Sequence, residues 1–144
     1  MFSAGIPFFN LTYKVWKFGP VSEELFIDLS SETTLLSAYI ERSSEDGSIC
    51  LSPVQQFCDD EFSDNELDLL DFAIERFGDK TAKELVGHTH RKNAPWYQTA
   101  MENGVLELLE NEEINHTELA INMRRLIEHD DRKLEIYDDF LENN

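Results

Sequence analysis

The segment from Phe77 to Trp96, FGDKTAKELVGHTHRKNAPW, specifies its local structure more tightly than any other part of the chain. Gly78 follows an apolar helical pattern and favours a left-handed helix end. The sequence TAKE, which begins at Thr81, has the spacing of a capping box and predicts a short helix. Pro95 suits the first turn of another helix, since the amide hydrogen that it lacks would be unpaired there. These signals predict a defined docking surface or core corner rather than a linker.

Apolar residues at helical spacing predict further helices in the second half of the chain. The sequence SDNE, which begins at Ser63, is a second capping box, and the apolar stripe Leu67, Leu70, Ile74 and Phe77 follows it. The sequence NHTE at 115–118 is a third and predicts the start of a C-terminal helix. The apolar positions of that helix are Leu119, Met123, Leu126 and Ile127, followed after two aspartates by Leu134, Tyr137, Phe140 and Leu141.

The first half of the chain contains fewer clear signals. The sequence LTYKVWKF at 11–18 is rich in β-forming residues and predicts a short strand that ends at Gly19-Pro20. Ser22 is placed to cap a helix that runs to Leu29. Residues 35–40 and 48–51 fit two strands, or the first of them extends a helix, and the periodicity does not decide between these alternatives. We therefore expect one mainly helical α+β domain over residues 1–144, with a small β element near the N-terminus.

The formal net charge of −18 is the strongest feature of the composition. Residues 101–144 carry 13 acidic and 4 basic residues, whereas residues 61–100 carry 8 and 5. This balance argues against direct nucleic-acid binding, because phosphate neutralisation needs clustered Lys and Arg. A basic protein partner is the more natural inference, with the field steering association. The alternative is that the acidity serves solubility alone.

No catalytic motif, metal site or cofactor site is predicted. His88 and His90 are two residues apart and would point in different directions on a helix, so a structural role is favoured over metal binding. Cys58 lies beside acidic residues that oppose a reactive thiolate. Trp16 and Trp96 are each either a buried side chain with its N–H satisfied or an interface anchor, and we favour the structural role for Trp96.

The sequence predicts a protein of the cytoplasm. Cys50 and Cys58 form no disulfide framework, and the N-terminus lacks the basic region of a signal peptide. No apolar run approaches the roughly 18 residues of a membrane span.

Two blocks of the chain resemble the Panacea domain, also called the SocA-like or phage-associated GepA-like domain. Trp16-Lys17-Phe18-Gly19-Pro20-Val21 is similar to the first block of that family, W-x-(aromatic)-G-P-V. The second block matches at Glu66, Leu70, Phe77-Gly78-Asp79, Glu84-Leu85, Thr89-His90 and Pro95-Trp96. The family usually begins with a longer N-terminal helix, which we expect to be shortened or missing here.

The resemblance implies an antitoxin that binds and neutralises a cognate toxin and is not an enzyme. Its motif residues would then form the scaffold: Trp16, Gly19, Pro20, Val21, Gly78, Asp79, Leu85, Thr89, His90, Pro95 and Trp96. From charge and placement, the expected contacts to a basic toxin are Tyr97, Glu107, Glu110, Glu112, Glu113, Asp138 and Asp139. The alternative is an acidic phage-type inhibitor that mimics DNA and occupies a nuclease or another DNA-binding protein. Homo-oligomer formation is left open.

Overall fold

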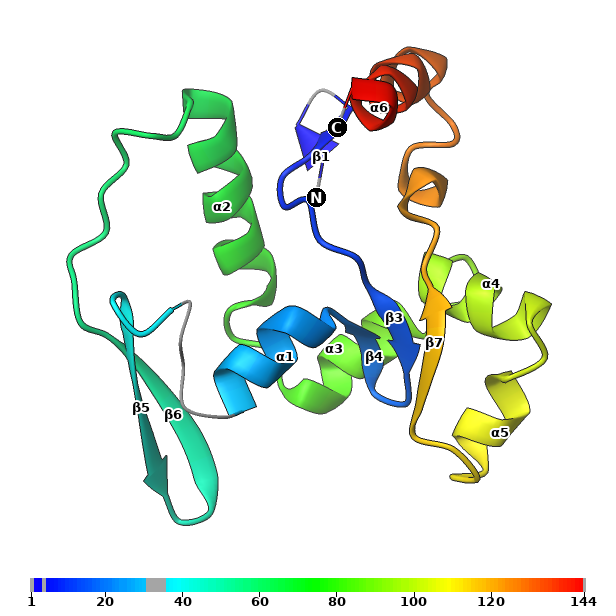
Figure 1. Cartoon of the computed structure of the whole chain (residues 1–144), viewed down its shortest axis with the longest axis horizontal. Coiled ribbons are helices and arrows are strands. Elements are labelled where there is room, and N and C mark those ends of the chain that lie inside the picture. The colour runs from blue at the N-terminus through cyan, green and yellow to red at the C-terminus, as the bar shows by residue number, and fades with distance from the viewer. Residues whose placement is uncertain (1, 4, 31–35, 144) are drawn as a thin grey trace.

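The computed structural model describes residues 2–3, 5–30 and 36–143 of the 144-residue chain. Within these ranges helices alternate with short antiparallel strands (Figure 1), as expected for an α+β protein rich in helix. In chain order the elements are β1 (Phe2–Ser3), β2 (Ile6–Pro7), β3 (Lys14–Trp16), β4 (Gly19–Val21), α1 (Glu23–Ser30), β5 (Ile40–Glu45), β6 (Ser48–Pro53), α2 (Asp64–Phe77), α3 (Ala82–Thr89), α4 (Pro95–Glu102), α5 (Leu106–Glu110), β7 (His116–Ala120), the 3-10 helix η1 (Met123–Leu126) and α6 (Asp131–Asn143).

The central sheet has the strand order β4-β3-β7, and both pairings are antiparallel. The predicted strand is confirmed at Lys14–Trp16, and it does end before Gly19. The Gly-Pro sequence, however, also begins a second strand that folds back on the first, with Trp16 opposite Gly19. Gly19 has a φ of +123°, which a residue with a side chain rarely adopts, so the tight return depends on glycine.

The prediction of a helix that starts at the third capping pattern is wrong. Residues 116–120 instead form strand β7, which pairs with the free edge of β3. The Thr117 hydroxyl donates a 2.8 Å hydrogen bond to the Val15 carbonyl, and Glu118, the expected partner in the cap, pairs with Lys14 instead. Thr117 and Leu119 are half-buried while their neighbours are exposed, which is the alternation of a strand with one covered face. The following residues form η1, and the last helix begins only at Asp131.

The other predicted helix starts are confirmed. The Glu66 carboxylate accepts hydrogen bonds from the Ser63 amide at 2.8 Å and from its hydroxyl at 2.7 Å, which stabilises the start of α2. The Thr81 cap of α3 and the Pro95 start of α4 also form as expected. The apolar stripe of α2 is correct at Leu67, Leu70 and Phe77, which are half-buried, but the side chain of Ile74 is 67% exposed.

Gly78 ends α2 without the left-handed conformation that the sequence predicted. Its φ and ψ are −63° and −26°, in the right-handed helical region. A Cβ atom at this position would lie 2.6 Å from the carbonyl oxygen of Ile74. Glycine is therefore favoured here by close approach of the backbone, not by a positive φ.

The region in which the periodicity left strand and helix as alternatives contains the β5–β6 hairpin. The hairpin turns at Asp46-Gly47, and both residues have a positive φ. The two-strand alternative is thus correct for 48–51, whereas the first strand begins at Ile40 and residues 36–39 form a bend and a turn. Residues 31–35 lie outside the described residues. Among the described strands, β5 and β6 pair only with each other, and the hairpin projects from one end of the molecule (Figure 1).

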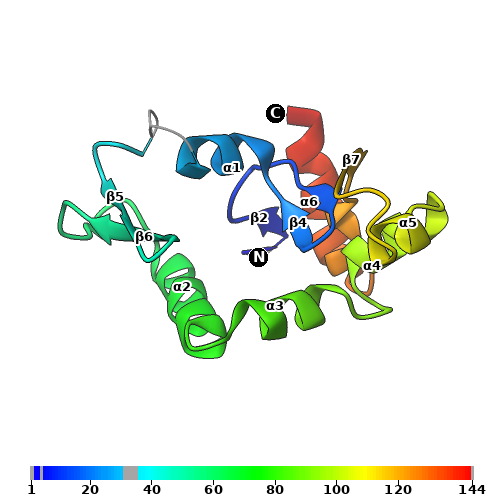
Figure 2. The same ribbon diagram turned by 90° about the horizontal axis from the view of Figure 1, so that it is seen from below.

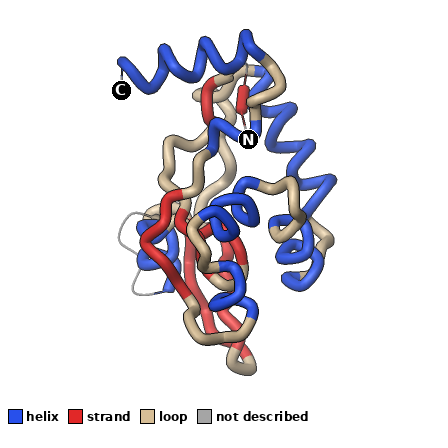
Figure 3. The backbone as a smooth tube through the Cα atoms, turned by 90° about the vertical axis from the view of Figure 1, so that its right-hand side faces the viewer, coloured by secondary structure: helices blue, strands red, loops and turns tan. Residues whose placement is uncertain are grey.

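The buried core lies at the other end of the molecule. Val15, Trp96, Ala100, Leu109 and Ile121 form one buried cluster that joins β3, α4 and α5 to the residue after β7. Figure 2 shows the hairpin and α2 at one end, α4, α5 and β7 at the other, and α1 and α3 between them. The last helix, α6, lies across the top of the molecule in the view of Figure 3. It packs on the N-terminal residues, since a Cβ on Gly5 would lie 2.8 Å from the carbonyl oxygen of Lys133.

Candidate protein-interaction site

Trp96 connects the two blocks that the sequence analysis singled out. Its side chain is 2% exposed, and its indole nitrogen donates a 2.9 Å hydrogen bond to the carbonyl oxygen of Trp16. The imidazole ring of His90 lies parallel to the indole, with ring centroids 3.6 Å apart. Both observations support the structural role that the sequence favoured for Trp96, since a buried tryptophan needs a partner for its N–H.

A second contact between the blocks joins Gly19 and Thr89. A Cβ on Gly19 would lie 3.0 Å from the Thr89 hydroxyl oxygen, so the turn before β4 packs directly on the end of α3. The hydroxyl donates to the Val86 carbonyl at 3.1 Å, which fixes its position. The structure therefore brings Trp16, Gly19, Thr89, His90 and Trp96 together in one cluster, which we call the motif cluster.

The other motif residues lie around this cluster or at the corner between α2 and α3. Pro20 is exposed, while Val21 and Pro95 are half-buried. At the corner, Asp79 is exposed beside Lys80, and the side chain of Leu85 is 38% exposed. These residues shape the surface next to the motif cluster more than they fill the core.

His90 is held in an environment that disfavours its charged form. Burial lowers the pKa of His90 below its usual value, and the negative charge of Glu110 only partly offsets this. Its buried Nε2 atom has no hydrogen-bond partner among the described residues. His88 instead packs edge-on against Phe77, with ring centroids 5.2 Å apart. Within the described part of the chain, no three His, Cys, Asp or Glu side chains are grouped as metal ligands would be.

An apolar groove of about 420 Å³ lies beside the motif cluster. Pro20, Thr89, Pro95 and Trp96 line one part of it, and Ile121, Met123 and Leu126 line another. We call it the tryptophan groove. The sequence analysis missed it because residues 121–126 were expected on a helix, whereas they follow a strand as an irregular segment and η1.

The acidic residues predicted as partner contacts lie in two separate groups. Figures 1 and 3 show α6, with Asp138 and Asp139, crossing one end of the molecule away from α5. Asp138 accepts hydrogen bonds of 3.0 and 2.8 Å from Arg124, and this contact lowers the pKa of its carboxyl group. The other group lies on α5 and the turn after it and consists of Glu107, Glu110, Glu112 and Glu113.

The remaining predicted contact residues differ in accessibility. Glu112 pairs with Lys17 at 2.7 Å, which lowers the pKa of the Glu112 carboxyl group. Glu107 and Glu113 are exposed and form no ion pair with the described residues. Tyr97 is half-buried and packs on the core, so less of its side chain is open to a partner.

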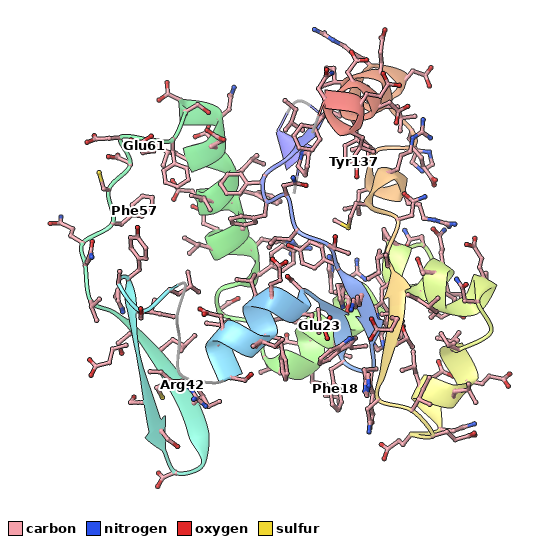
Figure 4. All side chains as sticks on the ribbon, viewed as in Figure 1. Phe18, Glu23, Arg42, Phe57, Glu61 and Tyr137 are labelled. Carbon is pink, nitrogen blue, oxygen red and sulfur yellow. The ribbon has the colours of Figure 1, made fainter. Side chains whose placement is uncertain are left out.

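A large set of exposed apolar side chains lies outside the core, from α1 in the middle of the molecule to the hairpin and α2 at its other end (Figure 2). Nine of them, which we call the apolar surface, lie on α1, on the hairpin and the residues flanking it, and on α2, with exposed fractions of 45% to 67%: Phe26, Ile27, Tyr39, Ile49, Leu51, Val54, Phe57, Phe72 and Ile74. Phe57, on the connection between β6 and α2, is labelled in Figure 4. Alternation places Ile49 and Leu51 on one face of β6 and Cys50 on the other.

The exposed area of the whole chain also shows how open this arrangement is. The chain exposes 10642 Å², whereas a compact monomer of 16.7 kDa would expose about 7,600 Å² by the usual scaling with mass.

The described helices include none with the length and apolar character needed to cross a membrane.

Comparison with known proteins identifies one family. The model of the family described as Antitoxin SocA-like, Panacea domain, matches residues 3–97, which include both motif blocks and the apolar surface. No curated protein and no solved structure matches the chain.

Proposed function

The chain belongs to the SocA-like Panacea domain family, and on this basis we propose that it is an antitoxin that neutralises a cognate toxin by direct protein–protein binding. The toxin would be blocked sterically or allosterically, with no covalent bond made or broken by this chain. The cytoplasm is the proposed place of action.

The observation that carries this proposal is the apolar surface. Exposed apolar side chains in this number on a monomer favour an interaction site, because burial against a partner would remove them from water. The β5–β6 hairpin supports the same conclusion, because a two-stranded hairpin is marginally stable alone and needs something to cover its apolar face.

The acidic residues would act mainly during encounter. Glu107, Glu110 and Glu113 are exposed near α5 and would attract a basic toxin over a range of about 8–10 Å at physiological salt. Asp139 would contribute in the same way from α6. Asp138 and Glu112 are paired with cations of this chain, so the toxin would have to compete with Arg124 or Lys17 for them.

We propose that residues 1–144 form one domain, although the family match ends at residue 97. Val15 lies inside the matched part, and Leu109 and Ile121 lie beyond it, yet all three belong to one buried cluster. Strand β7 pairs with β3 across the same boundary. Removing the C-terminal third would therefore expose the core.

Growth of cells that express the neighbouring reading frame tests the proposal. The neighbour is induced alone and then together with this chain. Toxicity that this chain relieves, with the two proteins co-purifying, supports the antitoxin function and identifies the partner. Toxicity that persists, or binding that duplex DNA competes away, favours the DNA-mimic alternative instead.

A further inference from the structure

A positively charged region lies within this acidic chain, around α3. Five of the 12 Lys and Arg residues, but only two acidic residues, fall between positions 76 and 92. The basic residues of this region are Arg76, Lys80, Lys83, Arg91 and Lys92. The proposed attraction of a basic toxin to acidic residues leaves this region without a role.

Most of these cations have no internal counter-charge. Among the described residues, Arg76, Lys83, Arg91 and Lys92 form no ion pair, whereas Arg124 and others elsewhere in the chain are paired. Lys80 pairs with the adjacent Asp79 at 3.4 Å, and that aspartate is 80% exposed. The charge of Lys80 also helps to lower the pKa of the Glu84 carboxyl group. The region therefore keeps most of its positive charge available to a partner.

The charges surround a depression of about 270 Å³ along α3. Arg76, Lys80 and Arg91 line it together with Phe77 and Leu85. Gly87 also lines it, and space remains open where its Cβ would be. We call this depression the basic groove.

Among the described residues that line the basic groove, Glu84 is the one acidic residue, and its carboxylate is held by the helix cap. Its carboxylate accepts hydrogen bonds from the Thr81 amide at 2.9 Å and from the Thr81 hydroxyl at 2.7 Å. These bonds lower the pKa of the Glu84 carboxyl group and hold it at the start of α3. Three cations thus line the groove together with one carboxylate, and a second carboxylate, that of Asp79, pairs with Lys80.

The basic groove continues into the tryptophan groove. His88 and Arg91 line both depressions, so the two meet at the C-terminal end of α3. The first depression offers guanidinium and ammonium groups, and guanidinium binds carboxylates with two parallel hydrogen bonds. The second offers an apolar floor that includes Trp96, Met123 and Leu126. A ligand that spans both would need carboxylates at one end and an apolar side chain at the other.

We propose that these two grooves together bind an extended acidic segment of a protein partner, with its carboxylates at Arg76, Lys80 and Arg91 and an apolar side chain in the tryptophan groove. Charge complementarity selects this occupant, since Arg76 and Arg91 form no ion pair with the described residues and the ion-pair partner of Lys80 is an exposed aspartate. The binding residues include none of the apolar surface, so the chain would hold a toxin and this segment at separate places.

Fluorescence anisotropy with a labelled peptide tests the proposal. The probe carries three aspartates, two glycines and a phenylalanine, and a second peptide has alanine in place of the phenylalanine. We expect the first to bind, with affinity that falls as salt rises. The double variant Arg76→Gln with Arg91→Gln should weaken binding about tenfold or more, as loss of charged hydrogen bonds predicts. Leu126→Asn, which adds no charge, should weaken binding of the phenylalanine peptide but not of the alanine peptide.

Arg132→Gln is the matched control, since Arg132 is an exposed cation on α6 that forms no ion pair with the described residues. It should leave peptide binding unchanged. Leu51→Asp should also leave it unchanged, which separates this test from that of the antitoxin function. Three results would overturn the proposal: no peptide binding, equal weakening by Arg132→Gln, or equal affinity for the two peptides. Displacement by inorganic phosphate at equal concentration would indicate a simple anion site instead.

Discussion

The indole nitrogen of Trp96 lies 2.9 Å from the carbonyl oxygen of Trp16, so one hydrogen bond joins two segments that are 80 residues apart in sequence. The same indole is covered by the ring of His90. Trp16 in turn packs edge-on against Phe26 of α1, with ring centroids 5.0 Å apart. The core is thereby connected through β3 to the helix that carries part of the apolar surface.

Replacing Trp96 by phenylalanine should destabilise the fold strongly. The change removes the hydrogen bond to the Trp16 carbonyl and leaves space in a fully packed position, which together cost about 2–4 kcal/mol. Urea unfolding followed by circular dichroism measures the loss. Phe18→Ala is the control, because Phe18 is 72% exposed and its loss should change the free energy of unfolding by less than about 0.5 kcal/mol. Equal effects of the two substitutions would contradict the assigned role of Trp96.

Two glycine substitutions should have opposite effects. Gly19→Ala forces a side chain into a φ of +123° and against the Thr89 hydroxyl, and should destabilise the fold by about 1–3 kcal/mol. Gly87→Ala lies inside α3 with open space around the new Cβ, and should stabilise the fold by about 0.5–1 kcal/mol. Thermal unfolding of both variants gives the two signs. A Gly19→Ala variant as stable as the wild type would contradict the close packing of the two motif blocks.

Stability should decrease in mild acid because of His90. Its pKa is lower in the folded chain than in the unfolded chain, where it is near the usual 6.5, because burial opposes the charged form. The unfolded state therefore binds a proton more readily, and folding stability falls as pH drops through about 6.5 toward the folded pKa. His90→Phe keeps a ring against Trp96 and should lose this part of the pH dependence. Denaturant unfolding at several pH values checks it, and identical pH profiles for the two proteins would contradict it.

Charge reversal near α5 should slow toxin binding. Glu107→Lys combined with Glu113→Lys replaces two exposed negative charges by positive charges, so the association rate should fall severalfold and depend less on salt. Glu135→Lys combined with Glu142→Lys, on α6 and outside the proposed contacts, changes the net charge equally and is the control. Stopped-flow mixing at two salt concentrations measures the rates. Association that is unchanged by the double substitution would remove these residues from the proposed encounter surface.

The sequence predicted structure best where local signals and packing agree. The caps at Ser63 and Thr81 and the helix start at Pro95 all form as expected, because each depends on residues within one helical turn. The capping pattern at Asn115 failed because pairing with β3 outweighs a local cap, a contact that no local pattern reveals. The predicted left-handed conformation of Gly78 was wrong for a related reason. Glycine is needed there because the Ile74 carbonyl oxygen leaves no space for a Cβ atom.

The candidate site was predicted only in part. The motif residues at 16–21 and 89–96 were recognised, but their convergence depends on long-range contacts such as that between Gly19 and Thr89. The apolar surface was not predicted. The alternation of Ile49 and Leu51 with Cys50 indicates a strand with one apolar face, but whether another element covers that face depends on long-range packing.

Calorimetric titration of the purified chain with the toxin encoded beside it tests the central claim most directly. The wild type and the Cys50→Asp variant should bind alike, because Cys50 lies on the face of β6 opposite Leu51. The Leu51→Asp variant should bind at least about tenfold more weakly, as expected for an apolar contact at the centre of an interface, while its melting temperature stays unchanged. Absence of binding by the wild type, or equal binding by the Leu51→Asp variant, would contradict an antitoxin that acts through its apolar surface.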